Sequence, residues 1–186
     1  MADLDCDVTA VALARTLIGT RLVSRIGGVE TAGVIIETEA YLRTGDPAAH
    51  AFRGVTRANA SAFGPPGTLY IHPMRALCGL DIVARDGSVL IRALEPVAGR
   101  ETMAARRSGA PLRLLAAGPG RLTQALGITR ALDGQRLAAA GCLLSIVQDC
   151  CATYKIVSTP RIGVRKATEW PLRFCAGGHT LLSKRV

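Results

Sequence analysis

Aromatic side chains are scarce in this sequence of 186 residues, where Phe, Trp and Tyr together account for only 4%. Long apolar runs are missing as well. The longest, over residues 137–147, is too short to span a bilayer and contains Gly and Ser. The first five residues lack the basic and then apolar pattern of a secretory signal peptide. We therefore expect a cytoplasmic protein without a transmembrane segment.

Paired metal ligands are also lacking. None of the six cysteines forms a Cys-x-x-Cys motif, and His50, His72 and His179 show no spacing typical of metal ligands. Structural zinc sites usually display such pairs, so we expect no metal site. The thiols, including the neighbouring Cys150 and Cys151, are expected to be reduced, as in most cytoplasmic proteins.

Acidic side chains are outnumbered by basic ones. The chain has 23 Lys and Arg against 14 Asp and Glu, a formal net charge of +9. This excess favours a polyanionic partner, such as nucleic acid or an anionic membrane surface. The 49% of hydrophobic residues is typical of a globular protein with a substantial core. Because repeats, linkers and composition shifts are absent from the sequence, we expect one α+β domain over residues 1–186.

Turn residues and the spacing of apolar residues predict a mixture of helices and strands. Asp7 is expected to cap a helix that ends at Gly19, and Gly27-Gly28 to connect strands over 21–26 and 29–41. Further strands are expected at 69–71, 81–95 (with a turn at 86–87), 137–147 and 154–158, and helices at 97–105, 112–117 and 119–126. The stretch 42–67 fits neither pattern, and irregular loops of this length are commonly functional.

The segment Glu37-Thr38-Glu39-Ala40-Tyr41 carries two carboxylates and an aromatic ring at alternate positions. Alternate residues of a strand share a face, so Glu37, Glu39 and Tyr41 are expected to lie together. In a dry site two such carboxylates resist being ionised together, and one could activate water beside a planar substrate. The pattern alone more often indicates a solvated strand face, because most charged side chains lie on the surface.

The irregular stretch and its flanks hold most of the scarce aromatic residues. Residues 63–67 (FGPPG) predict a rigid turn, since Pro fixes φ and Gly permits positive φ. His50 lies in the same stretch, although a loop histidine is more often a surface or capping residue than a catalytic one. Rings next to cationic side chains are typical of base-stacking platforms. The rings concerned are Tyr41, Phe52, Phe63 and Tyr70.

Several short motifs follow one another along nearly the whole chain. They are 37–41 (ETEAY), His50, 53–54 (RG), Thr56, Asn59, 63–67 (FGPPG), Tyr70, 90–96 (LIRALEP), 118–128 (GPGRLTQALGI), 160–164 (PRIGV) and 171–174 (PLRF). Each is weak alone, but together and in this order the chain resembles the alkyladenine (3-methyladenine) DNA glycosylase family.

The resemblance implies a monofunctional DNA N-glycosylase. Such an enzyme flips alkylated or deaminated purines (3-methyladenine, 7-methylguanine, hypoxanthine) from duplex DNA and hydrolyses the N-glycosidic bond. By the same resemblance, Glu39 is the general base that activates water, Arg92 lies near the water and phosphate site, and Tyr41 and His50 hold the flipped base. The implied partner is double-stranded DNA, with neither a metal nor a redox cofactor, in a monomer acting without a membrane or an obligate protein partner.

The implied fold is a mixed α+β domain with a curved, mainly antiparallel sheet flanked by helices and a hairpin that enters the minor groove. Tyr70 and the residues after it belong to the part that meets the base. There the chain departs from the family's pattern. His72 stands where a Tyr is usual, and the stretch up to Asp81 is one residue shorter than usual. By its approximate position, Arg75 is then the residue that fills the gap left by the flipped base, and Met74 is the other candidate.

Asp81 stands where the family usually has an Asn that helps to exclude guanine. An ionised Asp accepts hydrogen bonds but donates none, so we expect relaxed discrimination against guanine-type bases or a shifted substrate range. Two alternatives remain open at this point. One is a lesion-binding protein with weakened catalysis, and the other is an unrelated hydrolase that uses Glu37 and Glu39 on a small nucleoside.

Individual basic pairs are usually solvated charges, although some members of a set could line a DNA face. The sequence does not say which. The pairs are Arg106-Arg107, Arg165-Lys166 and Lys184-Arg185.

Overall fold

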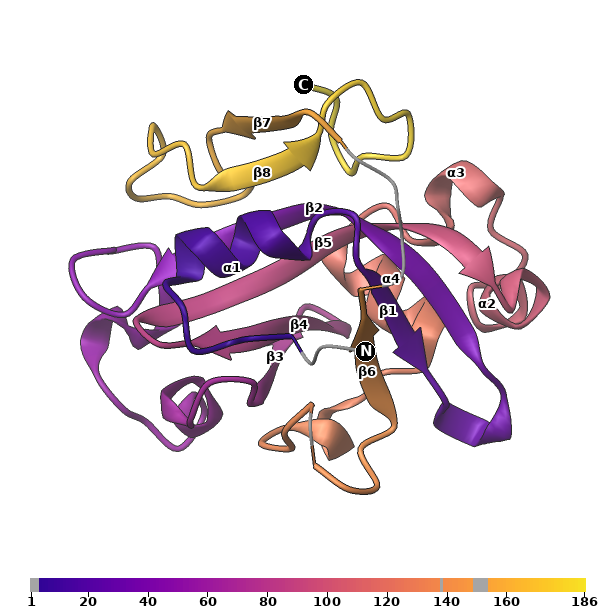
Figure 1. Ribbon diagram of the computed structural model, residues 1–186, viewed down its shortest axis with the longest axis horizontal. Helices are drawn as coiled ribbons and strands as arrows, with labels where there is room; N and C mark the ends of the chain where they lie inside the picture. Colours follow the sequence, from indigo (N-terminus) through magenta and orange to yellow (C-terminus); the bar gives the residue numbers. More distant parts are fainter. Residues whose placement is uncertain (1–3, 138, 149–153) are drawn as a thin grey trace.

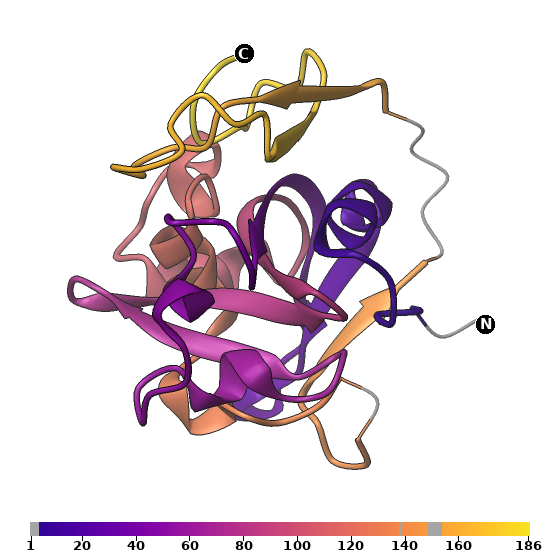
Figure 2. The same cartoon turned by 90° about the vertical axis from the view of Figure 1, so that its left-hand side faces the viewer.

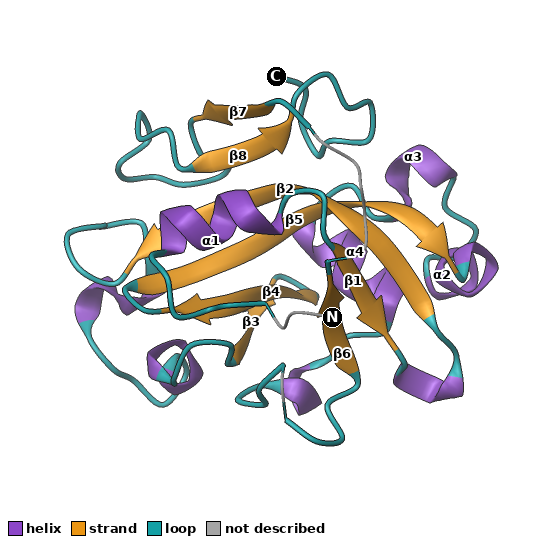
Figure 3. Ribbon diagram, viewed as in Figure 1, coloured by secondary structure: helices purple, strands orange, loops and turns teal. Residues whose placement is uncertain are grey.

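A computed structural model describes residues 4–137, 139–148 and 154–186 of the protein. The elements are α1 (Ala10–Leu17), β1 (Arg21–Ser24), β2 (Thr31–Leu42), β3 (Leu69–Met74), β4 (Leu77–Ala84), β5 (Gly87–Ala98), α2 (Arg100–Arg106), α3 (Leu112–Leu115), α4 (Pro119–Leu126), β6 (Leu144–Val147), β7 (Ile156–Thr159) and β8 (Arg173–Ala176), with short 3-10 helices at 26–28, 50–53, 60–63 and 130–132. Figures 1 and 3 show a curved sheet flanked by helices.

The strands pair antiparallel in the order β3-β4-β5-β2-β1-β6, with β8 beside β2 and β7 beside β8. The predicted α+β fold with a curved antiparallel sheet is therefore confirmed. The long irregular stretch at 42–67 is confirmed too, since its only regular structure among the described residues is the 3-10 helices at 50–53 and 60–63.

The first helix begins later than Asp7 predicts. Its N-cap is Thr9, whose hydroxyl oxygen accepts a hydrogen bond from the backbone N–H of Ala12 at 3.2 Å. The predicted Asp7 cap is wrong, because Asp7 lies two residues too early for its side chain to reach the free N–H groups. Asp7 instead pairs with Arg85 at the surface, with an N–O distance of 3.6 Å.

Other boundaries also differ from the prediction. Helix α2 begins at Arg100 rather than at Val97, because Val97 continues β5 alongside β2. The strand predicted over 137–147 is shortened to β6, and β8 was not predicted as a strand at all. Cys150 and Cys151 lie outside the described residues.

Strand β2 is buried on both faces. Ile35 belongs to the main core, which also takes in α1 and α4, whereas Val34 and Ile36 face a second cluster under the C-terminal segment. A strand of this kind forms a continuous hydrophobic run rather than a strict alternation. Each such apolar side chain contributes roughly 1.5–3 kcal/mol when it is removed from water.

The C-terminal segment lies over the second half of β2 (Figures 1 and 2). Glu37 pairs with Cys175 of β8 and Glu39 with Arg173, while β5 follows β2 on its other side. The register of β2 against β5 shifts around Glu37. The two carboxylates are thus covered by the neighbouring strands and by the C-terminal segment, which includes β8.

No helix among the described residues is long and apolar enough to cross a membrane. The longest, α1 and α4, contain eight residues each.

Candidate functional site

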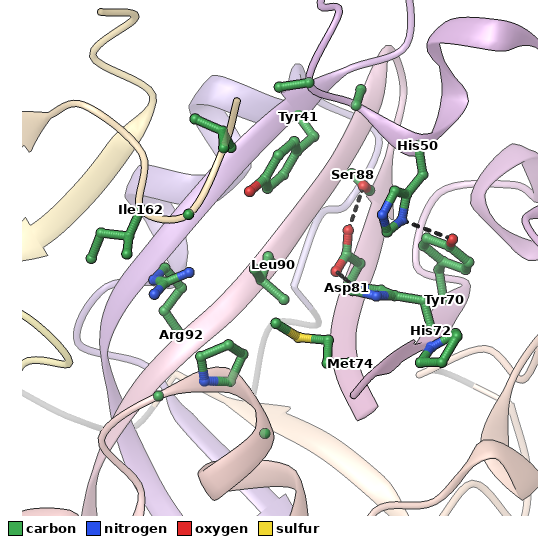
Figure 4. A pocket seen from close by; sticks show the side chains of 18 of the residues that line it. Tyr41, His50, Tyr70, His72, Met74, Asp81, Ser88, Leu90, Arg92 and Ile162 are labelled. Atoms are coloured by element: carbon green, nitrogen blue, oxygen red, sulfur yellow. Dashed lines mark hydrogen bonds and ion pairs between the residues drawn. The ribbon is translucent and has the colours of Figure 1, made fainter. Parts of the chain in front are cut away.

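A pocket of about 800 Å³ opens where the β3–β4 hairpin, β5 and the end of β2 meet. Residues 47–51, 117–121 and 162–166 complete its rim. In Figure 4, Tyr41 lies on one side of β5, and His50, Tyr70 and Asp81 lie on the other side. Segments that are far apart in the sequence therefore form two facing walls with β5 between them.

Three rings form a cluster in one wall. The ring centroids of His50 and His72 are 4.7 Å apart at 84°, and those of Tyr70 and His72 are 5.1 Å apart. Nδ1 of His50 lies 3.0 Å from the hydroxyl of Tyr70. Gly79 makes room for His72, since a Cβ there would lie 2.6 Å from the imidazole. His72 of β3 is paired with Gly79 of β4, and this pairing fixes the position of the His72 ring in the cluster.

Asp81 lies beside this cluster and is held on both of its carboxylate oxygens. Oδ1 is 3.1 Å from Nε2 of His72, and Oδ2 accepts a hydrogen bond from the hydroxyl of Ser88 at 2.7 Å. The side chains of His72 and Asp81 are 8% and 6% exposed. All three residues line the pocket, so Ser88 belongs to the site although the sequence analysis missed it.

Tyr41 forms the opposite wall and is supported from behind. The guanidinium carbon of Arg161 lies 4.6 Å from the centre of the Tyr41 ring. Arg161 also makes two hydrogen bonds to the carboxylate of Asp46, at 2.5 and 2.8 Å, and one to the carbonyl of Ala40 at 3.0 Å. The side chains of Arg161 and Asp46 are completely buried. This ion pair joins the loop before His50 to the segment 160–164.

Glu39 lies directly behind the pocket wall and is 0% exposed. Its Oε2 accepts hydrogen bonds from the hydroxyl of Tyr41 at 2.8 Å and from Nη1 of Arg92 at 3.2 Å. Its Oε1 accepts from the backbone N–H of Ile162 at 2.7 Å. Tyr41, Arg92 and Ile162 all line the pocket, so Glu39 is hydrogen-bonded to three residues of the pocket lining. The solvated strand face that the motif more often indicates is therefore wrong.

Glu37 has a different environment. It is also 0% exposed, and its carboxylate accepts hydrogen bonds from Arg92, from Arg173 and from both the backbone and the hydroxyl of Ser183. These contacts join β2, β5, β8 and the C-terminal segment. Arg92 donates to both Glu37 and Glu39, so the two acids share one cation. Glu37 is therefore a structural centre that holds Arg92 in place.

The ionisable groups of the pocket are displaced from their ordinary pKa values in different directions. Burial raises the pKa of Glu39, although Arg92 and the hydrogen bonds from Ile162 and Tyr41 oppose this. Burial lowers the pKa of His50, and the neighbouring His72 lowers it further. Burial also acts to lower the pKa of His72, but Asp81 outweighs it and the net pKa is raised. The pKa values of the two adjacent histidines are therefore shifted in opposite directions.

The tip of the β3–β4 hairpin lies at the mouth of the pocket. Met74 pairs with Leu77, and Arg75 and Ala76 form the turn between them. Met74, Arg75 and Leu77 line the pocket, and Leu77, which the sequence analysis missed, is 38% exposed although apolar. Arg75 has φ = 55°, a left-handed conformation that is unfavourable for a residue with a Cβ.

Four exposed cations surround the same mouth. They are Arg75, Arg121, Arg165 and Lys166. Of the three basic pairs seen in the sequence, only Arg165-Lys166 lines the pocket. Arg106 instead donates to the carbonyls of Ala125 and Ile26, and Arg107 to Gln124, so both stabilise the packing of the helices.

The expected site residues are brought together. Glu39 and Arg92 are hydrogen-bonded, and the other expected residues line one pocket: Tyr41, His50, Tyr70, His72, Met74, Arg75 and Asp81. Phe52 and Phe63 do not line it. Nothing in the sequence marked Asp46, Ser88 or Ser183, although Arg161 and Ile162 belong to the 160–164 motif. Among the described residues, no group of His, Cys, Asp and Glu side chains could hold a metal ion.

The chain is similar to known proteins over most of its length. Residues 5–180 match the family model described as Methylpurine-DNA glycosylase (MPG). A relative from Koribacter versatilis is 42% identical over 179 residues, which is 91% of this chain and 86% of the relative. A relative from Methanoculleus marisnigri is 43% identical over 182 residues, 94% of each chain. A relative from Agrobacterium fabrum is 40% identical over 178 residues, 95% of this chain and 88% of the relative. All three are provisionally named 3-methyladenine DNA glycosylases.

Proposed function

The chain belongs to the methylpurine-DNA glycosylase family, and from this premise we propose that it flips damaged purines out of duplex DNA and hydrolyses their N-glycosidic bond. In this proposal residues 1–186 act as one glycosylase domain, and the pocket between Tyr41 and the His50–Asp81 wall receives the base. Its substrates are purines alkylated at N3 or N7 and deaminated purines.

The observation that carries the proposal is the position of Glu39. It lies behind the pocket wall, where three donors leave one of its four acceptor positions, on Oε1, unused. A water molecule bound there can attack C1′ of the flipped nucleotide. The C1′–N bond breaks with its electron pair going to the base, and the proton of the water passes to Glu39. A purine that is cationic through alkylation thereby leaves as a neutral base, whereas hypoxanthine leaves as an anion that takes up a proton from water.

The surroundings of Glu39 support this role. A fixed carboxylate stabilises the positive charge that develops on the sugar, and it does so more strongly in a buried site than in water. Arg92 keeps the carboxylate oriented and lowers its pKa against the effect of burial. On the other side, the face of Tyr41 favours a cationic base through its π electrons.

The hairpin tip supports the flipping step. Met74, Arg75 and Leu77 are the side chains at the pocket mouth that can fill the gap left in the duplex. Flipping costs a few kcal/mol, less for a damaged base, and phosphate contacts from the cations at the mouth can offset part of it.

The experiment that tests the proposal measures base release from a duplex containing one 3-methyladenine, 7-methylguanine or hypoxanthine. The wild type should release damaged bases, whereas Glu39→Gln should lose about 10²- to 10⁴-fold in the single-turnover rate and still bind the lesion. Glu95→Gln is the matched control, because Glu95 is on β5 but does not line the pocket. Lesion binding without release by the wild type, or release only from free nucleosides, would contradict the proposal.

A further inference from the structure

Within one wall of the pocket, the pair Asp81 and Ser88 presents hydrogen-bond acceptors only. The hydroxyl of Ser88 donates its single hydrogen to Oδ2 of Asp81 at 2.7 Å, so only its lone pairs remain. The ionised carboxylate of Asp81 has no hydrogen to donate. Ser88 and Asp81 are adjacent on β5 and β4, and both line the pocket (Figure 4). A base that meets this pair can therefore bond to it only through N–H groups.

The orientation of the Asp81 carboxylate is fixed by His72 and Ser88. Nε2 of His72 lies 3.1 Å from Oδ1 of Asp81, and because the carboxylate only accepts, this nitrogen carries the hydrogen. The imidazole is held against Gly79, where a Cβ would lie 2.6 Å from it. With Ser88 and His72 on separate oxygens, the carboxylate cannot rotate without losing a buried hydrogen bond.

The donors nearest to Glu39 are directed at buried acceptors. The hydroxyl of Tyr41 donates to Glu39 at 2.8 Å, and three N–H groups of Arg92 donate to Glu37, Glu39 and Ser183. A carbonyl oxygen that faces Asp81 and Ser88 meets only their lone pairs. A buried lone pair opposite another lone pair is left unpaired, which is the situation that proteins discriminate against most strongly.

We propose that Asp81 and Ser88 select damaged purines by their exocyclic amino group. This inference rests on the proposed function. N-alkylated adenine and guanine carry such a group at position 6 or 2, whereas hypoxanthine has a 6-oxo group and no amino group. Asp81 and Ser88 therefore accept a hydrogen bond from the amino group of alkylated adenine or guanine, and hypoxanthine and its derivatives lack this hydrogen bond. Ser88 is a specificity-determining residue here because Asp81 holds its hydrogen and only its lone pairs remain.

The test compares two bases that differ only in the amino group. Duplexes carrying 7-methylguanine or 7-methylhypoxanthine are both cationic lesions, and each single-turnover release rate is divided by the uncatalysed rate for the same base. The wild type should favour 7-methylguanine by at least about tenfold, the ratio expected from one hydrogen bond to a charged group. Equal ratios from an active wild type would overturn the inference and leave the proposed function standing.

Two variants test whether Asp81 causes the preference for 7-methylguanine. Asp81→Asn offers N–H donors, so the preference should fall to within about threefold of unity by the same reasoning. Asp7→Asn, which changes an exposed carboxylate outside the pocket, should keep the wild-type ratio. A preference that survives Asp81→Asn in a folded variant would contradict the inference. Failure of the wild type to release any damaged base would contradict the proposed function itself. If Asp81→Asn does not fold, the wild-type comparison still decides.

Discussion

Glu39 combines burial with a proposed role that requires a negative charge. Its side chain is fully buried, and burial raises its pKa in spite of Arg92 and two hydrogen bonds. A buried acid with a raised pKa favours the folded state in its protonated form. Its contribution to stability is therefore present at low pH and lost as the pH rises through the folded-state pKa. The ionised form that we propose for catalysis costs stability at neutral pH.

The wild type should therefore lose stability relative to Glu39→Gln as the pH rises from acid to neutral, because only the wild type ionises at this position. Wild-type release of alkylated purines should increase with pH as Glu39 ionises, above the ordinary range for a glutamate. Thermal unfolding and single-turnover rates measured over the same pH series check both statements. A Tm difference between the two proteins that does not change with pH would contradict the first.

Pairs of elements are held together around the site by a few buried contacts. The ion pair of Asp46 and Arg161 joins two loops that the sequence separates by 115 residues. Burial acts to raise the pKa of Asp46, but hydrogen bonds from Arg161 and from the backbone outweigh it and lower the pKa. For a lowered pKa the stabilisation is present above the unfolded-state value and is lost as the pH falls through the folded-state value.

Asp46→Asn should reduce the free energy of unfolding by about 3–5 kcal/mol at neutral pH, because it leaves Arg161 buried without its charge partner. The loss should be smaller in acid, where Asp46 of the wild type becomes protonated. Denaturant unfolding at neutral and acidic pH measures both values. Asp7→Asn, at the surface, should change stability by less than about 1 kcal/mol.

The β3–β4 hairpin carries a strained residue at its tip. Arg75 has a positive φ, which costs about 1–2 kcal/mol for a residue with a Cβ and much less for glycine. Arg75→Gly should therefore be about 1 kcal/mol more stable than Arg75→Ala, although both remove the guanidinium.

Both variants should release damaged bases more slowly from duplex DNA, since neither can fill the gap, and should act normally on single strands, where there is no gap. Unfolding curves and paired rates on the two substrates measure this. An equal loss of rate on single strands would show that Arg75 acts in some way other than by filling the gap in the duplex.

The whole molecule carries a formal net charge of +9, but contacts with DNA phosphates depend on where the positive charges lie. Arg165 and Lys166 lie at the pocket mouth, whereas Arg25 is paired with Glu30 beside the start of β2. Thr31, which follows Glu30, lies ten residues before Tyr41 on β2, about 30 Å of strand. Arg25 is therefore remote from the pocket that Tyr41 lines.

Replacing Arg165 or Lys166 by Ala should reduce the slope of log affinity against log salt by about 1, the value expected for one lost phosphate contact. Arg25→Ala, which changes the net charge equally, should leave the slope unchanged. Titrations of a lesion duplex over a range of salt concentrations provide the measurement. A slope that responds equally to all three would indicate a diffuse charge effect rather than contacts at the mouth.

Local patterns predicted much of the fold. Helix α4 over 119–126 has the predicted bounds, and the hairpin of β1 and β2 follows from apolar runs interrupted by Gly27-Gly28. The predicted bounds of helices and strands were wrong where tertiary contacts decided them. Val97 became a strand residue because β2 extends far enough to pair with Pro96 and Ala98 on either side of it, and β8 became a strand because it pairs with β2 and β7.

Residue type and order alone established the motif of Glu39 and Tyr41, the basic charge, and the family to which the chain belongs. None of these properties depends on contacts between distant residues. Three other features appear only in the folded chain: Glu37 and Glu39 are buried rather than solvated, Asp46 meets Arg161, and Ser88 donates its hydrogen to Asp81. Burial and hydrogen-bond direction depend on strands that pair across the whole chain, and no local pattern contains that information.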